Sequence, residues 1–201
     1  MPGCWLEKGT NEVLVFDIVG PRETRSEGLD RPLLEQLQMS KPLMHRNENE
    51  NLQLATEKPV LAGSFCSGNG WQEVKFDSPV NGRYFCLEAL NAHDGSRLAC
   101  IAEMYALDGQ GNRLSRELWT VKYADSEDVA YVNRSADKFF DLQESTYWST
   151  RSEDAYPHTV VIDLGTECTL GGIQYLPRME SEIPGGIKFF KVYVRKDNFR
   201  Y

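Results

Sequence analysis

In its larger, carboxy-terminal part the chain is a succession of short apolar–polar alternations, each ended by Gly, Asn, Asp or Pro. In one of them, Val160, Ile162 and Leu164 alternate with Thr159 and Asp163. A period of two is typical of a strand that turns one face to a core, whereas an amphipathic helix needs a period near 3.6 residues. Strand-like segments dominate and helical periods are almost absent, which predicts an all-β, antiparallel β-sandwich or jelly roll. The candidate strands are PVLAGSF, WQEVKF, GRYFCLEAL, ACIAEMYALD, LWTVKYA, HTVVIDLG, GGIQYLPR and IKFFKVYVRK.

The composition is that of an ordinary globular protein and argues against two classes of partner. The chain has 201 residues, 41% of them hydrophobic, and a formal net charge of −8. This length suffices for one domain with a full core and short appendages. The Lys and Arg residues form no cluster, so we expect neither nucleic acid nor an anionic membrane as partner, because both need a concentrated basic face. No apolar run approaches the roughly 20 residues of a membrane span, and the first residues do not resemble a signal peptide.

The five cysteines leave the redox compartment open. They show no CxxC spacing, so we do not expect a zinc or redox site. Cys86 and Cys100 lie on neighbouring candidate strands and can pair, but an odd number of cysteines argues against a disulfide framework. The alternative is that the cysteines are small core residues of strands.

Three parts follow one another along the chain. Residues 1–21 contain two strand-like segments that end at Gly20-Pro21, and their pattern begins so abruptly that we expect a fragment of a longer protein. Residues 22–57 are predicted to be a linker with one short helix, capped by Asp30. Residues 58–201 contain the candidate strands. Because two strands and a linker have no core of their own, we expect the first part to pack poorly without a partner strand.

Several linked motifs in residues 58–201 resemble a known fold. ADKFFDLQESTYWST, PHTVVIDLG, GGIQYLPR and GGIKFFKVYV follow one another as in the first two thirds of a discoidin-like domain, the coagulation factor type C fold shared by family 32 carbohydrate-binding modules. The segment before them, which ends in Ala102-Glu103, is similar to the closing strands of that family. The resemblance implies a galactose-binding-domain-like sandwich that is circularly permuted, with DGQGNRLS joining the old last strand to the old first one. The alternative, two halves of separate sandwiches, would leave both cores open.

The amino-terminal stretch PGCWLEKGTNEVLVFDIVGP resembles the final strands of the galactose-binding jelly roll in family 35 glycoside hydrolases. The resemblance implies that the chain is the carboxy-terminal region of a bacterial β-galactosidase, secreted or periplasmic, whose two catalytic carboxylates lie on an upstream α/β barrel. This chain has no βαβ pattern, and we expect no catalytic site in it. The implied function is weak binding of galactose-containing glycans, which targets the enzyme to its substrate. The alternative is a structural accessory domain that packs on the catalytic domain of the parent chain or mediates oligomerisation.

The resemblance also implies a structural calcium site in the stretch ADKFFDLQESTYWST. Lys138 and Gln143 would offer backbone carbonyls, Asp141 a carboxylate, and Thr146 its carbonyl or hydroxyl, while Glu103 would close the site from a neighbouring strand. Calcium takes six to eight oxygen ligands at irregular spacing, which suits this set. The residue after Asp141 is not the glycine that the family commonly has there. The alternative is a loop that hydrogen bonds order without metal.

The same resemblance implies that loops at one end of the sandwich bind the sugar. Large aromatic residues such as Trp119 and Trp148 are predicted to lie in the core instead, because such rings dominate sandwich interiors. The loop of residues 91–98 lacks the exposed aromatic residue found in many binding members, and Arg178 has the alternative role of a structural ion pair. The candidate sugar ligands are Arg178, Glu180, Arg151, Tyr156, His93, Asp94, Arg97 and Glu127.

Overall fold

The structure, a computed structural model, describes residues 51–179 and 184–201. The expected strand tail of residues 1–21, most of the expected linker and the predicted sugar ligand Glu180 lie outside the described residues. The described part is built almost entirely from antiparallel strands, which confirms the predicted all-β sandwich. The elements are β1 (Leu61–Ser64), β2 (Gln72–Ala89), β3 (Cys100–Ile101), β4 (Glu103–Leu107), β5 (Thr120–Ala124), the 3-10 helix η2 (Ala136–Phe140), β6 (Trp148–Ser149), β7 (His158–Leu176) and β8 (Phe189–Arg195).

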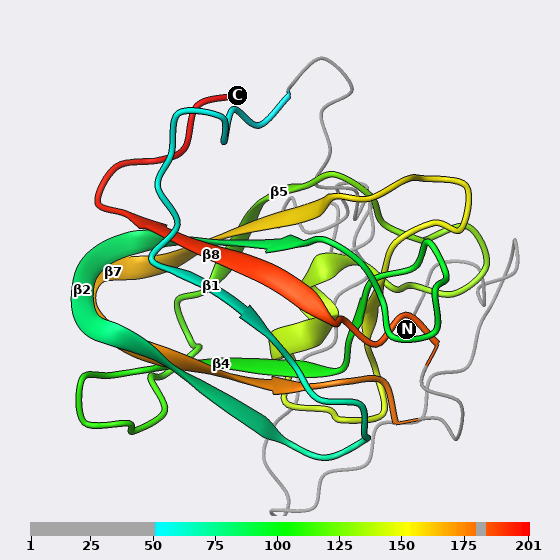
Figure 1. Cartoon of the computed structure of the whole chain (residues 1–201), viewed down its shortest axis with the longest axis horizontal. Helices are drawn as coiled ribbons and strands as arrows, with labels where there is room; N and C mark the ends of the chain where they lie inside the picture. Colours follow the sequence, from blue (N-terminus) through cyan, green and yellow to red (C-terminus); the bar gives the residue numbers. More distant parts are fainter. Residues whose placement is uncertain (1–50, 180–183) are drawn as a thin grey trace, which may run out of the picture. The chain divides into compact units, whose positions relative to one another are not determined.

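Two long strands, β2 and β7, build both layers of the sandwich. In the main sheet the strand order is β1-β8-β2-β7-β4, with β5 paired to β7, while β3 and β6 form a separate pair. Figure 1 shows β2 and β7 curving together so that each passes from one layer to the other. Two pairs of candidate strands, WQEVKF with GRYFCLEAL and HTVVIDLG with GGIQYLPR, are therefore single bent strands. The turn residues between the two segments of each pair predict that one strand ends and another begins. In the structure they bend a continuous strand instead.

The bend of β2 lies at two register shifts in its ladder with β7. One shift falls between Lys75 and Val80 and the other between Gly82 and Tyr84. Extra residues of this kind bend a strand and increase its twist. A Cβ atom at Gly82 would lie 2.3 Å from Val194 Cγ1, so only glycine lets β8 approach this closely.

Aromatic side chains fill the space between the layers, as predicted. Trp148 and Phe139 are fully buried, and Trp119 retains only 7% exposure. Phe65 stacks between Tyr175 and Phe190, with ring centres 4.1 and 4.2 Å away.

A second apolar cluster covers the outer face of the layer that contains β5 and β8. Residues before β1 and after β8 reach this cluster, and Gln53 N–H donates to the carbonyl oxygen of Arg200 at 2.9 Å. Strand β7 is consequently buried on both faces here, and Thr159 and Asp163, which alternate with Val160, Ile162 and Leu164, are buried as well. The cluster consists of Cys86, Tyr123, Val161, Tyr193 and Phe199, with Leu52, Leu54, Tyr84 and Tyr201 packed against it.

Cys86 and Cys100 are both buried free thiols, so the possible disulfide between them does not form. Burial raises the pKa of each thiol above its usual value, which keeps both in the neutral form. Among the described residues, no helix has the length and apolar character needed to span a membrane.

Candidate functional site

The loops that the sequence predicts to carry the site gather at one end of the sandwich. Ala89, at the end of β2, pairs with His158 at the start of β7 and with Phe190 near the start of β8. Ala124, at the end of β5, pairs with Val160. The loops that follow β2 and β5 therefore lie beside those that precede β7 and β8. We call this region the loop end.

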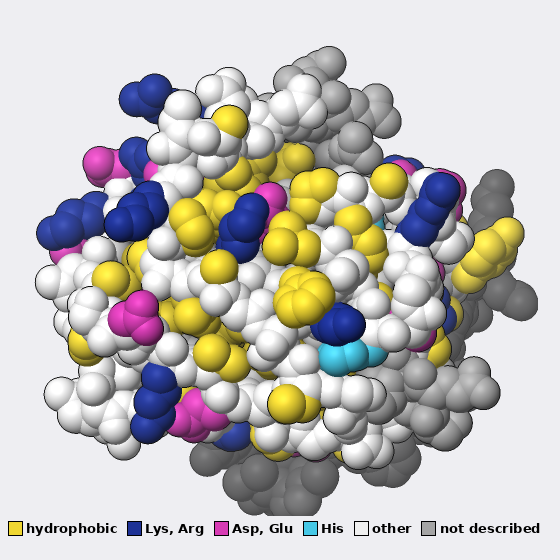
Figure 2. All heavy atoms as spheres, viewed as in Figure 1, with side chains coloured by type: hydrophobic (Ala, Val, Ile, Leu, Met, Phe, Trp, Pro, Cys, Tyr) yellow, Lys and Arg dark blue, Asp and Glu magenta, His cyan; other side chains and the backbone are white. Residues whose placement is uncertain are grey.

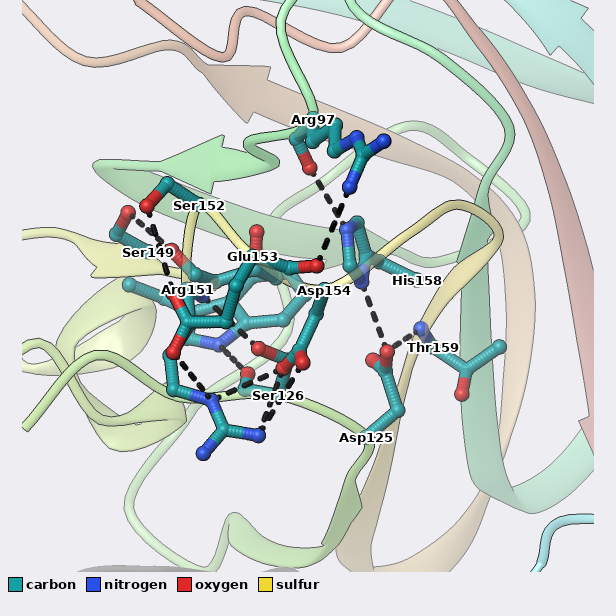
Figure 3. A network of polar contacts seen from close by, with 12 residues as sticks. Arg97, Asp125, Ser126, Ser149, Arg151, Ser152, Glu153, Asp154, His158 and Thr159 are labelled. Atoms are coloured by element: carbon teal, nitrogen blue, oxygen red, sulfur yellow. Dashed lines mark hydrogen bonds and ion pairs between the residues drawn. The ribbon is translucent and has the colours of Figure 1, made fainter.

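His158 lies among these loops and is fully buried. Its Nδ1 lies 2.8 Å from Asp125 Oδ2, and its Nε2 lies 2.8 Å from the carbonyl oxygen of Arg97. Asp125 Oδ1 also accepts a hydrogen bond of 2.6 Å from the N–H of Thr159. Figure 3 shows the imidazole between Arg97 and Asp125, with one nitrogen turned to each. His158 thereby ties the loop after β5 to the loop after β2.

Two guanidinium groups belong to the same network. Arg151 forms a two-pronged contact with Asp154, with Nε 3.0 Å from Oδ2 and Nη2 3.3 Å from Oδ1. The N–H of Arg151 donates to Ser126 Oγ at 2.9 Å, which anchors the loop before β7 to the loop after β5. Exposed Arg97 reaches the carbonyl oxygen of Glu153 through Nη1 at 3.4 Å (Figure 3). A guanidinium has five N–H donors, and this contact uses one of them.

Asp94 and Tyr156 also lie at the loop end, but the side chain of each forms hydrogen bonds with backbone groups. Asp94 Oδ1 accepts from the N–H of Ser96 at 3.0 Å, and Oδ2 accepts from the N–H of Gly185 at 3.1 Å. Partial burial opposes ionisation, yet these hydrogen bonds lower the pKa of Asp94. The hydroxyl of Tyr156 donates to the carbonyl oxygen of Leu98. Both side chains therefore shape the loops of the site.

Glu127 and His93 differ in their exposure. Glu127 is buried and its Oε1 accepts a hydrogen bond of 2.7 Å from the N–H of Ala136, at the start of η2. This carboxylate faces the protein interior, so we do not retain it as a sugar ligand. His93 is exposed, with Nε2 3.0 Å from the carbonyl oxygen of Phe65.

Arg178 lies in a separate group of side chains. Its Cζ is 4.3 Å from the centre of the Tyr147 ring, and Cζ of Arg134 is 5.2 Å from the same ring. Arg134 also pairs with Asp128 at 2.6 Å. Contacts with aromatic faces are a common way to hold arginine side chains in place.

The sequence interpretation missed the residues that organise the loop end. Asp125, Asp154 and His158 were not among the candidate ligands, although all three lie at strand ends or in the predicted loops. Tyr131 was missed as well and is 99% exposed. It lies in a loop whose base is held by the pairing of Asp128 with Arg134. An aromatic residue in a stretch without alternation is the signal that could have identified it.

The predicted calcium loop is rich in oxygen atoms that converge. Thr146 Oγ1 lies 2.9 and 2.8 Å from the two carboxylate oxygens of Asp141 and 2.9 Å from the carbonyl oxygen of Gln143. A hydroxyl has one hydrogen and can serve only one of these three acceptors at a time. The turn passes through Leu142 with φ of 68°, the left-handed conformation that glycine adopts without strain. Leu142 thus adopts the turn conformation at the position where the resemblance predicts glycine.

Glu103 completes this arrangement from β4. Its side chain is 2% exposed, Oε2 is paired with Arg116, and Oε1 has no hydrogen-bond partner among the described residues. Burial raises the pKa of Glu103, Arg116 opposes that rise, and the nearby charge of Asp141 adds to it. A buried carboxylate oxygen beside a second carboxylate fits a hard cation such as calcium. No group of three His, Cys, Asp or Glu side chains gathers within residues 51–179 and 184–201, so carbonyl and hydroxyl oxygens would have to supply the other ligands.

The face drawn in Figure 2 carries scattered Lys and Arg side chains, several of them beside Asp or Glu. Hydrophobic side chains are concentrated near the middle of this face. A shallow hollow of about 400 Å³ lies where β1 meets β8, lined by Ala62, Gly63, Ser64, Leu90, Phe189, Phe190 and Lys191. None of the predicted sugar ligands lines it.

Residues 121–201 match the F5/8 type C domain family. F5/8 type C domains are a family of ligand-binding modules that commonly bind carbohydrates. The chain is also similar to galactose oxidase from Gibberella zeae, with 28% identity over 87 residues. The similar region covers 43% of this chain and only 13% of the length of galactose oxidase.

Proposed function

We propose that the module is a glycan-binding accessory region and that it binds sugar at the loop end, through Arg97 and Arg151 with Tyr131 as a stacking surface. The observation that carries this proposal is the network of Figure 3, in which the exposed Arg97 side chain contacts the carbonyl oxygen of Glu153 and Arg151 pairs with the neighbouring Asp154. Arginine donors suit sugar hydroxyls, which accept as well as donate hydrogen bonds.

Tyr131 supplies the exposed aromatic ring that the loop of residues 91–98 lacks. A pyranose face is apolar, and an exposed ring held on an anchored loop can cover it. Because a sugar bound in a few loops buries little surface, we expect weak, millimolar affinity.

Galactose-containing glycans are the ligand class that we propose. The similarity to galactose oxidase supports this choice, since that protein is named for galactose. The resemblance of residues 2–21 to family 35 glycoside hydrolases supports a secreted or periplasmic β-galactosidase as the parent. In that parent the module would be non-catalytic and would hold the enzyme near polymeric substrate.

We also propose that a structural calcium ion braces the loop of residues 138–146. Asp141, Glu103, Thr146 and the carbonyl oxygens of Lys138 and Gln143 would hold it. When bound, the ion would supply positive charge to oxygens that now face each other. It has no direct part in sugar binding.

A structural accessory domain is the second candidate. The engagement of Asp94, Tyr156 and Glu127 with backbone groups favours it, because these three residues shape the loops and leave fewer groups for a ligand. In this role the module would pack on the catalytic domain of the parent chain or on another subunit.

Titration of the whole chain with galactose, lactose and a glycan array separates the two candidates. We expect millimolar binding that is lost in Arg97→Ala and Arg151→Ala and weakened at least about fivefold in Tyr131→Ala. Arg113→Ala is the matched control, because it removes an exposed arginine that contacts Trp71 and Tyr105 away from these loops. Absence of binding to every glycan would overturn the glycan-binding proposal and leave the structural one.

A further inference from the structure

We infer that Arg116 is a built-in counter-ion of the proposed cation site, that it shares Glu103 with the cation, and that it keeps the affinity for calcium low. The inference rests on the proposed calcium site. It assigns to Arg116, which lies outside the loop of residues 138–146, the control of how strongly that loop binds a divalent ion.

Arg116 is held on several sides and is 4% exposed. Nη1 pairs with Glu103 Oε2 and donates to the carbonyl oxygen of Met104 at 3.0 Å, while Nη2 donates to the hydroxyl of Tyr105 at 2.9 Å. Its Cζ lies 3.7 Å from the centre of the Tyr105 ring. A guanidinium with this many contacts stays in place when a second cation arrives. If it left, the buried acceptor atoms that it contacts would lose their hydrogen-bond donor.

Arg116 occupies only one of the two carboxylate oxygens of Glu103. Oε1 remains buried without a hydrogen-bond partner among the described residues, as does Nε of Arg116. Arg116 fixes the carboxylate in position and leaves one oxygen for an ion.

The net negative charge of the site, which would attract a divalent ion, is therefore small. Glu103 and Asp141 contribute two negative charges, Arg116 offsets one, and Lys138 Nζ lies 3.6 Å from Asp141 Oδ2. The affinity of a calcium site follows the number of charged ligands and the rigidity of the site. A fixed positive charge next to a ligand carboxylate repels a divalent ion, and burial strengthens that repulsion.

Calorimetric titration with calcium chloride tests the inference in four forms of the whole chain. Arg116→Met removes the charge and keeps an unbranched side chain, and we expect it to bind calcium at least about tenfold more tightly than the parent. Arg116→Lys keeps the charge, and we expect an affinity within about threefold of the parent. Arg113→Met is the matched control. In the parent, the Arg113 side chain stacks on the same Tyr105 ring but pairs with Gln174 instead of Glu103. The affinity of this variant for calcium should therefore equal that of the parent.

The melting temperature in thermal unfolding gives a second readout, which does not depend on the heat released when calcium binds. Without calcium, Arg116→Met should melt below the parent, because the buried Glu103 loses its counter-ion. Calcium should raise the melting temperature of this variant more than that of the parent. The double variant Glu103→Gln/Arg116→Met removes both charges, and we expect it to regain stability and to lose most of the response to calcium.

The outcomes separate the inference from the site on which it rests. Equal or weaker binding of calcium by Arg116→Met, with measurable binding by the parent, overturns the inference and leaves the site. Failure of Arg116→Met to fold even with calcium also overturns it. Absence of calcium binding by both the parent and Arg116→Met overturns the proposed site, and the inference with it.

Discussion

The imidazole of His158 lies 2.8 Å from the carboxylate of Asp125, 33 residues earlier in the chain, and joins two loops in the interior of the loop end. Its other nitrogen faces the carbonyl oxygen of Arg97 at 2.8 Å. The two contacts connect residues that lie 33 and 61 positions away from His158 in the sequence. The loop end is therefore organised around one buried residue that itself contacts no solvent.

Replacing His158 tests this role. We expect His158→Ala to lower the free energy of unfolding by about 2–4 kcal/mol, because it leaves the Asp125 carboxylate and the Arg97 carbonyl without their buried partner. Asp125→Ala should cost a similar amount, and the double variant should cost clearly less than the sum, with a coupling of about 1–3 kcal/mol. Urea unfolding of the four proteins measures the cycle. Additive effects would show that the contact does not couple the two loops.

Strand positions and the aromatic core were predictable from sequence, whereas the site was predictable only in part. The alternation in HTVVIDLG identified a strand, and Trp119 and Trp148 were assigned to the core, because local period and side-chain size determine these features. The pairing of His158 with Asp125 depends on how β5 and β7 meet, which no local pattern contains. Glu127 shows the converse: a loop position predicted a surface role, and the fold turned its carboxylate inward.

The burial of Thr159 and Asp163 could not be predicted from the sequence for a related reason. Alternation distinguishes one strand face from the other but does not reveal whether a distant segment covers the second face. Here Phe199 and residues before β1 provide that cover. The predicted circular permutation remains a prediction, although strands from residues 61–107 and from residues 120–195 pair within one sheet.

Phe199 tests how far the module depends on its last residues. The side chain is 3% exposed and packs on the outer cluster with Cys86, Tyr123 and Val161. We expect Phe199→Ala to lower the free energy of unfolding by about 3 kcal/mol. Tyr131→Ala is the control, since this 99% exposed ring should change stability by less than about 0.5 kcal/mol. Equal effects of the two substitutions in urea unfolding would mean that the tail does not contribute to the fold.

Asp163 predicts a dependence of stability on pH. Hydrogen bonds of 2.7 and 2.9 Å from the Arg83 guanidinium lower the pKa of this buried carboxyl, and the Gly165 N–H and Lys122 add to the effect. A carboxyl with a depressed folded pKa stabilises the fold above its unfolded pKa of about 3.9, and that contribution disappears as the pH falls through the folded pKa. We expect Asp163→Asn to lower the free energy of unfolding by about 2 kcal/mol at pH 7 and by clearly less at pH 3.

Unfolding measured at both pH values checks this expectation. Arg83→Gln is the companion variant, and its cost should shrink over the same pH interval because it removes the same pair. A cost of Asp163→Asn that is equal at pH 7 and pH 3 would contradict the assignment of the pair as a pH-dependent contribution.

Leu142 predicts a stabilising substitution in the proposed calcium loop. Its side chain is 73% exposed and its φ is 68°, so the residue bears the cost of the left-handed conformation and gains little from packing. We expect Leu142→Gly to raise the free energy of unfolding by about 0.5–1 kcal/mol, after the greater flexibility of glycine in the unfolded chain is taken into account. Val132→Gly, at an exposed position without positive φ, should instead lower it by a similar amount. Destabilisation by both substitutions in urea unfolding would show that Leu142 contributes contacts that outweigh its backbone strain.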